Sequence, residues 1–151
     1  IGLDFWGKKG LSKEKQVEYF DKIVEACAKK NRLMSVHIRG AEKEALRIID
    51  RWRPRRCVLH WFSGSLQEQQ DFVELGCYFS INANMLSNMD RINAVPRERI
   101  LVESDGPYSK VEGKKYHPGY LLREYELIAK ALAEPDLIKL VYSNFKILLR
   151  I

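Results

Sequence analysis

Residues 57–72, CVLHWFSGSLQEQQDF, contain the pattern that decides the fold. A short apolar run ends at His60, and a small polar segment, 63–65, leads into residues with helical spacing. Ser65 and Glu68 have the spacing of a capping box, in which each side chain accepts a hydrogen bond from a free backbone N–H group at the helix start. The stretch therefore predicts a strand, a short loop and a helix.

The same unit recurs along the chain. Apolar residues at three- and four-residue spacing predict helices over 13–30, 41–52, 65–76 and 118–132, with Ser12 available to cap the first. Short apolar runs predict strands at 34–38, 57–60, 78–82 and 100–103, and a last strand at 140–142 before a terminal helix. This alternation indicates an α/β fold of parallel strands with right-handed crossovers. An open doubly wound sheet and a (β/α)8 barrel both satisfy it.

The composition narrows the class of protein. With 151 residues, 46% of them hydrophobic, the chain has the size and composition of one soluble globular domain. No run approaches the roughly 20 apolar residues that a membrane span needs, so we expect no membrane partner. The three cysteines show no metal-binding spacing, which is typical of buried thiols in a reducing cytoplasm. The net charge of +6 favours a polyanionic partner such as nucleic acid.

Three predicted strands end in residues that can bind metals. His37 and His60 each end an apolar run, and Glu103 and Asp105 follow the run ILV. Because reactive groups of parallel α/β folds gather at the carboxyl ends of strands, we expect His37, His60 and Asp105 to converge. Two imidazoles and a carboxylate suit a divalent ion such as Zn, Mn or Mg. A single histidine at a strand end is often only structural, and Asp105 could simply form a turn. The occurrence of such residues after three strands favours a metal site. His117 follows no strand and is predicted to lie in a loop.

The basic residues divide between the two ends of such a fold. The run RWRPRR at 51–56 follows a helix, so we expect it opposite the site. The basic residues predicted to follow strands, and so to lie near phosphates, are Lys8, Lys9, Arg39, Lys110, Lys114 and Lys115. Of the aromatic pair after His60, we expect at least one residue to pack in the core, leaving Trp61 able to stack on a base or sugar. Ser63 enters a helix whose free N–H groups are predicted to face a phosphate.

Four segments in this order, IGLD, VHIRGA, LHWFSGS and ILVESDGPY, resemble the TatD family of metal-dependent deoxyribonucleases over nearly the whole chain. The details HWFSG, GCYFSINANML and PRERILVESDGP are most similar to the TatD-like nucleases of Qat anti-phage defence systems. The resemblance implies hydrolysis of DNA phosphodiester bonds in a cytoplasmic protein with one or two divalent ions, which we expect to act as a monomer and to have further defence proteins as partners.

Residue by residue, the resemblance implies metal-ligand positions at His37, His60 and Asp105, with Asp105 also taking part in catalysis. Glu103 matches the first acidic residue of the family's ETD motif, where we expect it to orient a ligand or contact substrate. The family also has an HxH motif in its first strand and a Glu before IGLD, and neither occurs in these 151 residues. We therefore expect the C-terminal portion of a (β/α)8 barrel, with strands 1–2 and most of strand 3 absent from the chain.

Two departures lie near the predicted site. Gly40 stands where the family commonly has Asp in an Arg-Asp-Ala motif, and Ser104 replaces Thr in ETD. The predicted metal ligands are unaffected by these departures, but the departures allow more than one class of substrate. Two alternatives to a deoxyribonuclease are a hydrolase of the same barrel type acting on a small molecule, and a non-catalytic fragment that binds nucleic acid or protein.

Overall fold

A computed structural model describes residues 1–7, 10–115 and 117–150 of the chain. Its main sheet has five parallel strands, which lie side by side in the order in which they occur along the chain. These strands are β1 (Gly2–Asp4), β2 (Met34–Arg39), β3 (Cys57–His60), β4 (Tyr78–Ile81) and β5 (Ile100–Val102). A doubly wound sheet reverses its strand order at a switch point, and this sheet does not. The winding in one direction is that of a barrel wall.

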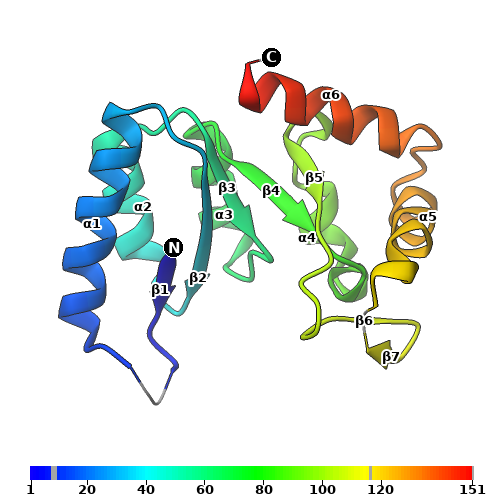
Figure 1. The fold of residues 1–151 in the computed structure, drawn as a ribbon, viewed down its shortest axis with the longest axis horizontal. Coiled ribbons are helices and arrows are strands. Elements are labelled where there is room, and N and C mark those ends of the chain that lie inside the picture. Colours follow the sequence, from blue (N-terminus) through cyan, green and yellow to red (C-terminus); the bar gives the residue numbers. More distant parts are fainter. Residues whose placement is uncertain (8–9, 116, 151) are drawn as a thin grey trace.

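Helices cover the sheet along its length (Figure 1). The α-helices are α1 (Lys13–Lys29), α2 (Glu42–Trp52), α3 (Leu66–Glu74), α4 (Met89–Asn93), α5 (Leu121–Leu132) and α6 (Leu137–Leu149). Short 3-10 helices occupy η1 (Ala83–Ser87), η2 (Arg97–Arg99) and η3 (Pro118–Tyr120), and a small hairpin pairs β6 (Lys110–Val111) with β7 (Lys114–Lys115). Helix α1 packs on β1 and α2, whereas α6 packs on β5 at the other end of the sheet.

Local signals set the ends of the helices. The Ser12 hydroxyl accepts a hydrogen bond from the Lys15 N–H at the start of α1, as predicted. The predicted capping box at the start of α3 is also present, with the Ser65 N–H donating to Glu68 and the Glu68 N–H donating to Ser65. After α3, Gly76 has a φ of +80°, a conformation that glycine adopts without strain, and this turns the chain into β4.

Two predictions about secondary structure need correction, and one element was not predicted from the sequence. Residues 140–142, predicted as a strand, lie in α6, whose buried residues at positions 137, 141, 144 and 148 have helical spacing. The predicted helix over 118–132 begins as η3 and becomes α-helical only at Leu121. The hairpin of β6 and β7 was not predicted, because two-residue strands rich in lysine show no apolar alternation.

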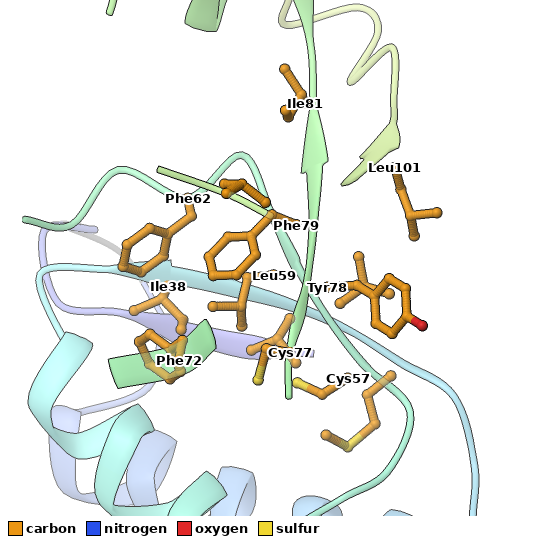
Figure 2. Close-up of a cluster of buried hydrophobic side chains, with 14 of the residues drawn as sticks. Ile38, Cys57, Leu59, Phe62, Phe72, Cys77, Tyr78, Phe79, Ile81 and Leu101 are labelled. Carbon is orange, nitrogen blue, oxygen red and sulfur yellow. The ribbon is translucent and has the colours of Figure 1, made fainter. Parts of the chain in front are cut away.

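The core lies between the sheet and its helices (Figure 2). Phe62 is buried and meets Phe72 and Phe79 edge to face, with ring centroids 5.5 and 5.9 Å apart. Phe62 is thus the packing member of the aromatic pair after His60, and it anchors the loop that follows β3. Cys57 and Cys77 are buried free thiols, as predicted, whereas Cys27 is only partly buried. Over the described part of the chain, every helix is too short or too polar to cross a membrane.

One buried amide fastens the last helix to the sheet. The Nδ2 atom of Asn144 in α6 donates hydrogen bonds of 2.8 Å to the carbonyl oxygens of Arg97 and Ile100, just before and at the start of β5. Asn144 is buried, so water cannot replace these contacts. This side chain therefore sets the position of α6 against β5.

Replacing Asn144 with Ala should lower the free energy of unfolding by about 2 kcal/mol, because a buried carbonyl oxygen would lose its donor. Urea unfolding followed by circular dichroism measures the change. Ser143→Ala, at an exposed neighbour in the same helix, is the matched control and should change stability little. Equal stability of the two variants would show that the amide does not hold α6 in place.

Candidate metal centre

The three predicted metal ligands line one cavity at the carboxyl ends of the strands. This cavity has a volume of about 620 Å³. It is lined by Asp4, His37, Ile38, Arg39, His60, Trp61, Ser63, Asp105 and Tyr108. His37 comes from β2, His60 from β3 and Asp105 from the loop after β5. The parallel sheet thus brings together the three residues that the strand-end pattern singled out.

The two histidines face each other inside this cavity. Nδ1 of His37 lies 3.3 Å from Nε2 of His60, and the ring centroids are 5.5 Å apart. Two imidazole nitrogens on a tetrahedral zinc ion, each about 2.0–2.1 Å from it, are about 3.3–3.4 Å apart. The separation fits a shared ion, and it also allows one ring to donate a hydrogen bond to the other. Metal binding would then displace the proton between the rings.

Glu103 fixes the orientation of His60. Both carboxylate oxygens of Glu103 lie 3.2 Å from Nδ1 of His60. The Ser80 hydroxyl and the Asn82 amide, both from buried positions, donate to the same carboxylate. A carboxylate only accepts hydrogen bonds, so Nδ1 of His60 carries the proton and Nε2 presents its lone pair toward His37. A carboxylate behind a histidine in this way is the usual support of a metal ligand.

Asp4 is a site residue that the sequence reasoning missed. Its Oδ2 atom lies 3.9 Å from Nε2 of His37 and 3.7 Å from the Arg39 guanidinium. Its Oδ1 atom accepts hydrogen bonds from the backbone N–H groups of Trp6 and Gly7. Asp4 ends β1, so the strand-end rule that singled out His37 and His60 could also have found it.

The surroundings shift the pKa values of the three predicted metal ligands in different ways. Burial, and then the nearby His60, lower the pKa of His37 below its ordinary value. The hydrogen bond to Glu103 raises the pKa of His60. Burial is also the main cause that raises the pKa of the Asp105 carboxyl, against the opposing effect of His60. The site therefore contains one histidine that favours the neutral form and one that Glu103 holds protonated at Nδ1.

Asp105 lies beside the histidine pair without completing a metal cluster. Its Oδ1 atom is 3.9 Å from Nδ1 of His60, the nitrogen that faces Glu103, and its backbone is left-handed with a φ of +45°. Within residues 1–7, 10–115 and 117–150, no three His, Cys, Asp or Glu side chains form a group that could hold a metal ion. The fit to a metal therefore rests on the two facing nitrogens, and further ligands would have to join them.

The predicted substrate-binding residues divide into two groups. Arg39, Trp61 and Ser63 line the cavity. Trp61 has a φ of +42°, and it also lines a smaller cavity of about 120 Å³ toward η1 and α4. Lys114 and Lys115 are exposed in β7 and line neither cavity, while Lys8 and Lys9 fall outside the described residues.

The start of α3 differs from the prediction that its free N–H groups face a phosphate. The Glu68 carboxylate lies there and accepts a hydrogen bond of 2.8 Å from the Ser65 N–H. This negative charge disfavours a second anion at the same helix end. His117 caps η3 through its ring nitrogen, which agrees with its predicted place outside the site.

The Glu103 contact makes stability depend on pH. Because the folded-state pKa of His60 is raised, its stabilising contribution is complete below the ordinary value of 6.5 and is lost as the pH rises through the folded-state pKa. Glu103→Gln should therefore lower the free energy of unfolding more at about pH 6 than at about pH 9. Urea unfolding at both pH values checks this. Glu126→Gln, at an exposed position on α5, is the control. A loss that does not vary with pH would contradict the role given to Glu103.

The family model described as TatD related DNase matches residues 1–150. An uncharacterized metal-dependent hydrolase of Buchnera aphidicola is 29% identical over 99% of this chain and 61% of its own length. The 3'-5' ssDNA/RNA exonuclease TatD of Citrobacter rodentium is 27% identical over 85% of this chain and 54% of its own. Deoxyribonuclease Tat-D of Schizosaccharomyces pombe is 27% identical over 80% of this chain and 40% of its own. The chain thus spans about half the length of these relatives.

Solved structures with the same fold give a similar result. A TatD homologue from Escherichia coli superposes with a TM-score of 0.85 at 23% identity, over 98% of this chain and 61% of that one. An uncharacterized amidohydrolase from Saccharomyces cerevisiae gives a TM-score of 0.85 at 16% identity, over 98% of this chain and 63% of that one. At these identities the similarity shows the fold.

Proposed function

The chain belongs to the TatD-related DNase family, and from this premise we propose that the whole protein is a metal-dependent nuclease that hydrolyses DNA phosphodiester bonds. The observation that carries the proposal is the 3.3 Å approach of His37 Nδ1 to His60 Nε2 inside the cavity, with Glu103 behind His60. A histidine pair arranged in this way suits a metal ion, because its two facing nitrogens lie in a cavity and a carboxylate fixes the orientation of one ring.

The side chains of this cavity divide the work of hydrolysis. His37 and His60 would hold a divalent ion, Mg, Mn or Zn, and a second ion would need other ligands. When bound, such an ion polarises a phosphoryl oxygen and lowers the pKa of a water molecule. Asp105 would accept the proton of the attacking water at its carboxylate, since a raised pKa brings this group nearer to neutral pH. Arg39 supplies a positive charge at the cavity wall for a phosphate oxygen.

The finer predictions depend on the resemblance of the motifs. The segments HWFSG and GCYFSINANML support a place among the nucleases of Qat anti-phage defence, acting in the cytoplasm as a monomer with defence proteins as partners. The relatives are longer than this chain, which supports the further proposal that the chain corresponds to the C-terminal portion of a (β/α)8 barrel.

A hydrolase of a small molecule is the second candidate. A cavity of about 620 Å³ falls in the range that drug-sized ligands occupy, and this observation favours it. The metal chemistry would be shared, so only the substrate separates the two functions. A non-catalytic fragment would keep the fold but bind metal weakly or not at all.

Activity on DNA tests the proposed function. The full-length protein should hydrolyse single- or double-stranded DNA with added Mg or Mn, and EDTA should abolish the reaction. His60→Ala and Asp105→Ala should each lower the rate at least about a hundredfold, because one removes a metal ligand and the other the proton acceptor. His117→Ala, which changes the remaining histidine outside the cavity, should retain activity. Hydrolysis that survives both site substitutions and EDTA would overturn the mechanism.

The two ends of the fold should also differ in their contribution to DNA binding. The β6–β7 hairpin lies at the end toward which the arrows of β1 and β2 point, whereas residues 53–56 connect α2 to the start of β3 (Figure 1). Lys114→Glu with Lys115→Glu should therefore weaken DNA binding and flatten its salt dependence more than Arg55→Glu with Arg56→Glu. Fluorescence anisotropy over a range of salt concentrations measures both. An equal or reversed effect would show that DNA does not approach from the predicted end.

A further inference from the structure

Gly40 makes room for an exposed tryptophan at the rim of the cavity. Gly40 has a φ of +67°, and a Cβ atom at this position would overlap Nε1, Cδ1 and Cε2 of the Trp6 indole. The glycine that departs from the family's Arg-Asp-Ala motif thus has a physical consequence here. It lets an aromatic ring from the loop after β1 lie against the backbone at the end of β2.

Trp6 is held in place although it is exposed. Trp6 is 64% exposed. The Arg39 guanidinium lies 5.3 Å from the centroid of the Trp6 ring. The backbone N–H of Trp6 donates to Asp4, which also lies 3.7 Å from Arg39. A chain of contacts therefore runs from His37 through Asp4 and Arg39 to the Trp6 indole, which is open to solvent. An ordered indole loses little conformational entropy when a second flat group binds to it.

We infer that Trp6 is a stacking platform for an unpaired nucleobase of the DNA strand whose phosphate enters the cavity. This inference rests on the proposed nuclease function and adds a positioning residue to it. Base stacking on an exposed aromatic ring tolerates any sequence and suits a rim position. Arg39 lies under the ring and also lines the cavity, so one side chain links the base platform to the phosphate end of the site. In a duplex, neighbouring base pairs cover the faces of each base, so the platform requires an unpaired strand.

Binding in EDTA tests the platform without requiring hydrolysis. The full-length protein is titrated into a short fluorescein-labelled oligothymidylate and into an abasic strand of the same length, and the anisotropy is recorded. Trp6→Ala should weaken binding of the oligothymidylate about tenfold and leave binding of the abasic strand unchanged. Trp6→Phe should retain most of the affinity, because a smaller ring still stacks. Tyr142→Ala, at an exposed aromatic on α6, is the matched control and should change neither.

Gly40→Ala provides a second variant that keeps the indole but displaces it. It should reproduce the loss seen for Trp6→Ala, and combining the two should add little further loss, because both remove one interaction. An unchanged affinity of Trp6→Ala for oligothymidylate, or an equal loss on the abasic strand, would overturn the platform. Base-dependent binding without any metal-dependent hydrolysis would refute the proposed nuclease function and leave the platform standing.

Discussion

The contact between the Glu103 carboxylate and Nδ1 of His60 is the interaction on which the site depends. It requires three neighbouring strands in register, because His60 lies opposite Ser80 across β3 and β4, and the Glu103 N–H bonds to the Ile81 carbonyl across β4 and β5. Ser80 and Asn82 give their buried polar groups to the same carboxylate. The sheet therefore does more than carry the site. Its register selects the nitrogen of His60 that faces the cavity.

The polar contacts that orient the His60 ring are closer than those that orient the His37 ring. His60 is tied to a carboxylate that has two further donors, whereas Asp4 approaches His37 only at 3.9 Å. Burial lowers the pKa of His37, and the hydrogen bond to Glu103 raises that of His60. The hydrogen bond to Glu103 holds the His60 imidazole in a single tautomer. His37 has no such close partner, so its proton could move from Nδ1 to Nε2, the nitrogen that faces Asp4, if a cation bound at Nδ1. Such an asymmetric pair can exchange a hydrogen bond for a shared metal ion with little movement.

The helices and strands whose apolar residues recur at regular spacing could be predicted from the sequence. Apolar spacing identified the strands that carry His37 and His60, and it failed at residues 140–142 because a short apolar run cannot distinguish a strand from one face of a helix. Contacts between distant segments were harder. Ser80 lies in an apolar strand and shows no sign of its bond to Glu103, and nothing in the sequence around Gly40 indicates that Trp6 lies against it.

The facing nitrogens of His37 and His60 should share a metal ion in the metal-loaded protein, and anomalous diffraction from crystals soaked in Mn or Zn would locate that ion. An anomalous peak should appear in the cavity between His37 Nδ1 and His60 Nε2, with Glu103 still bonded to Nδ1 of His60. A metal-soaked crystal in which the two rings stay directly hydrogen-bonded, with no peak between them, would contradict this prediction.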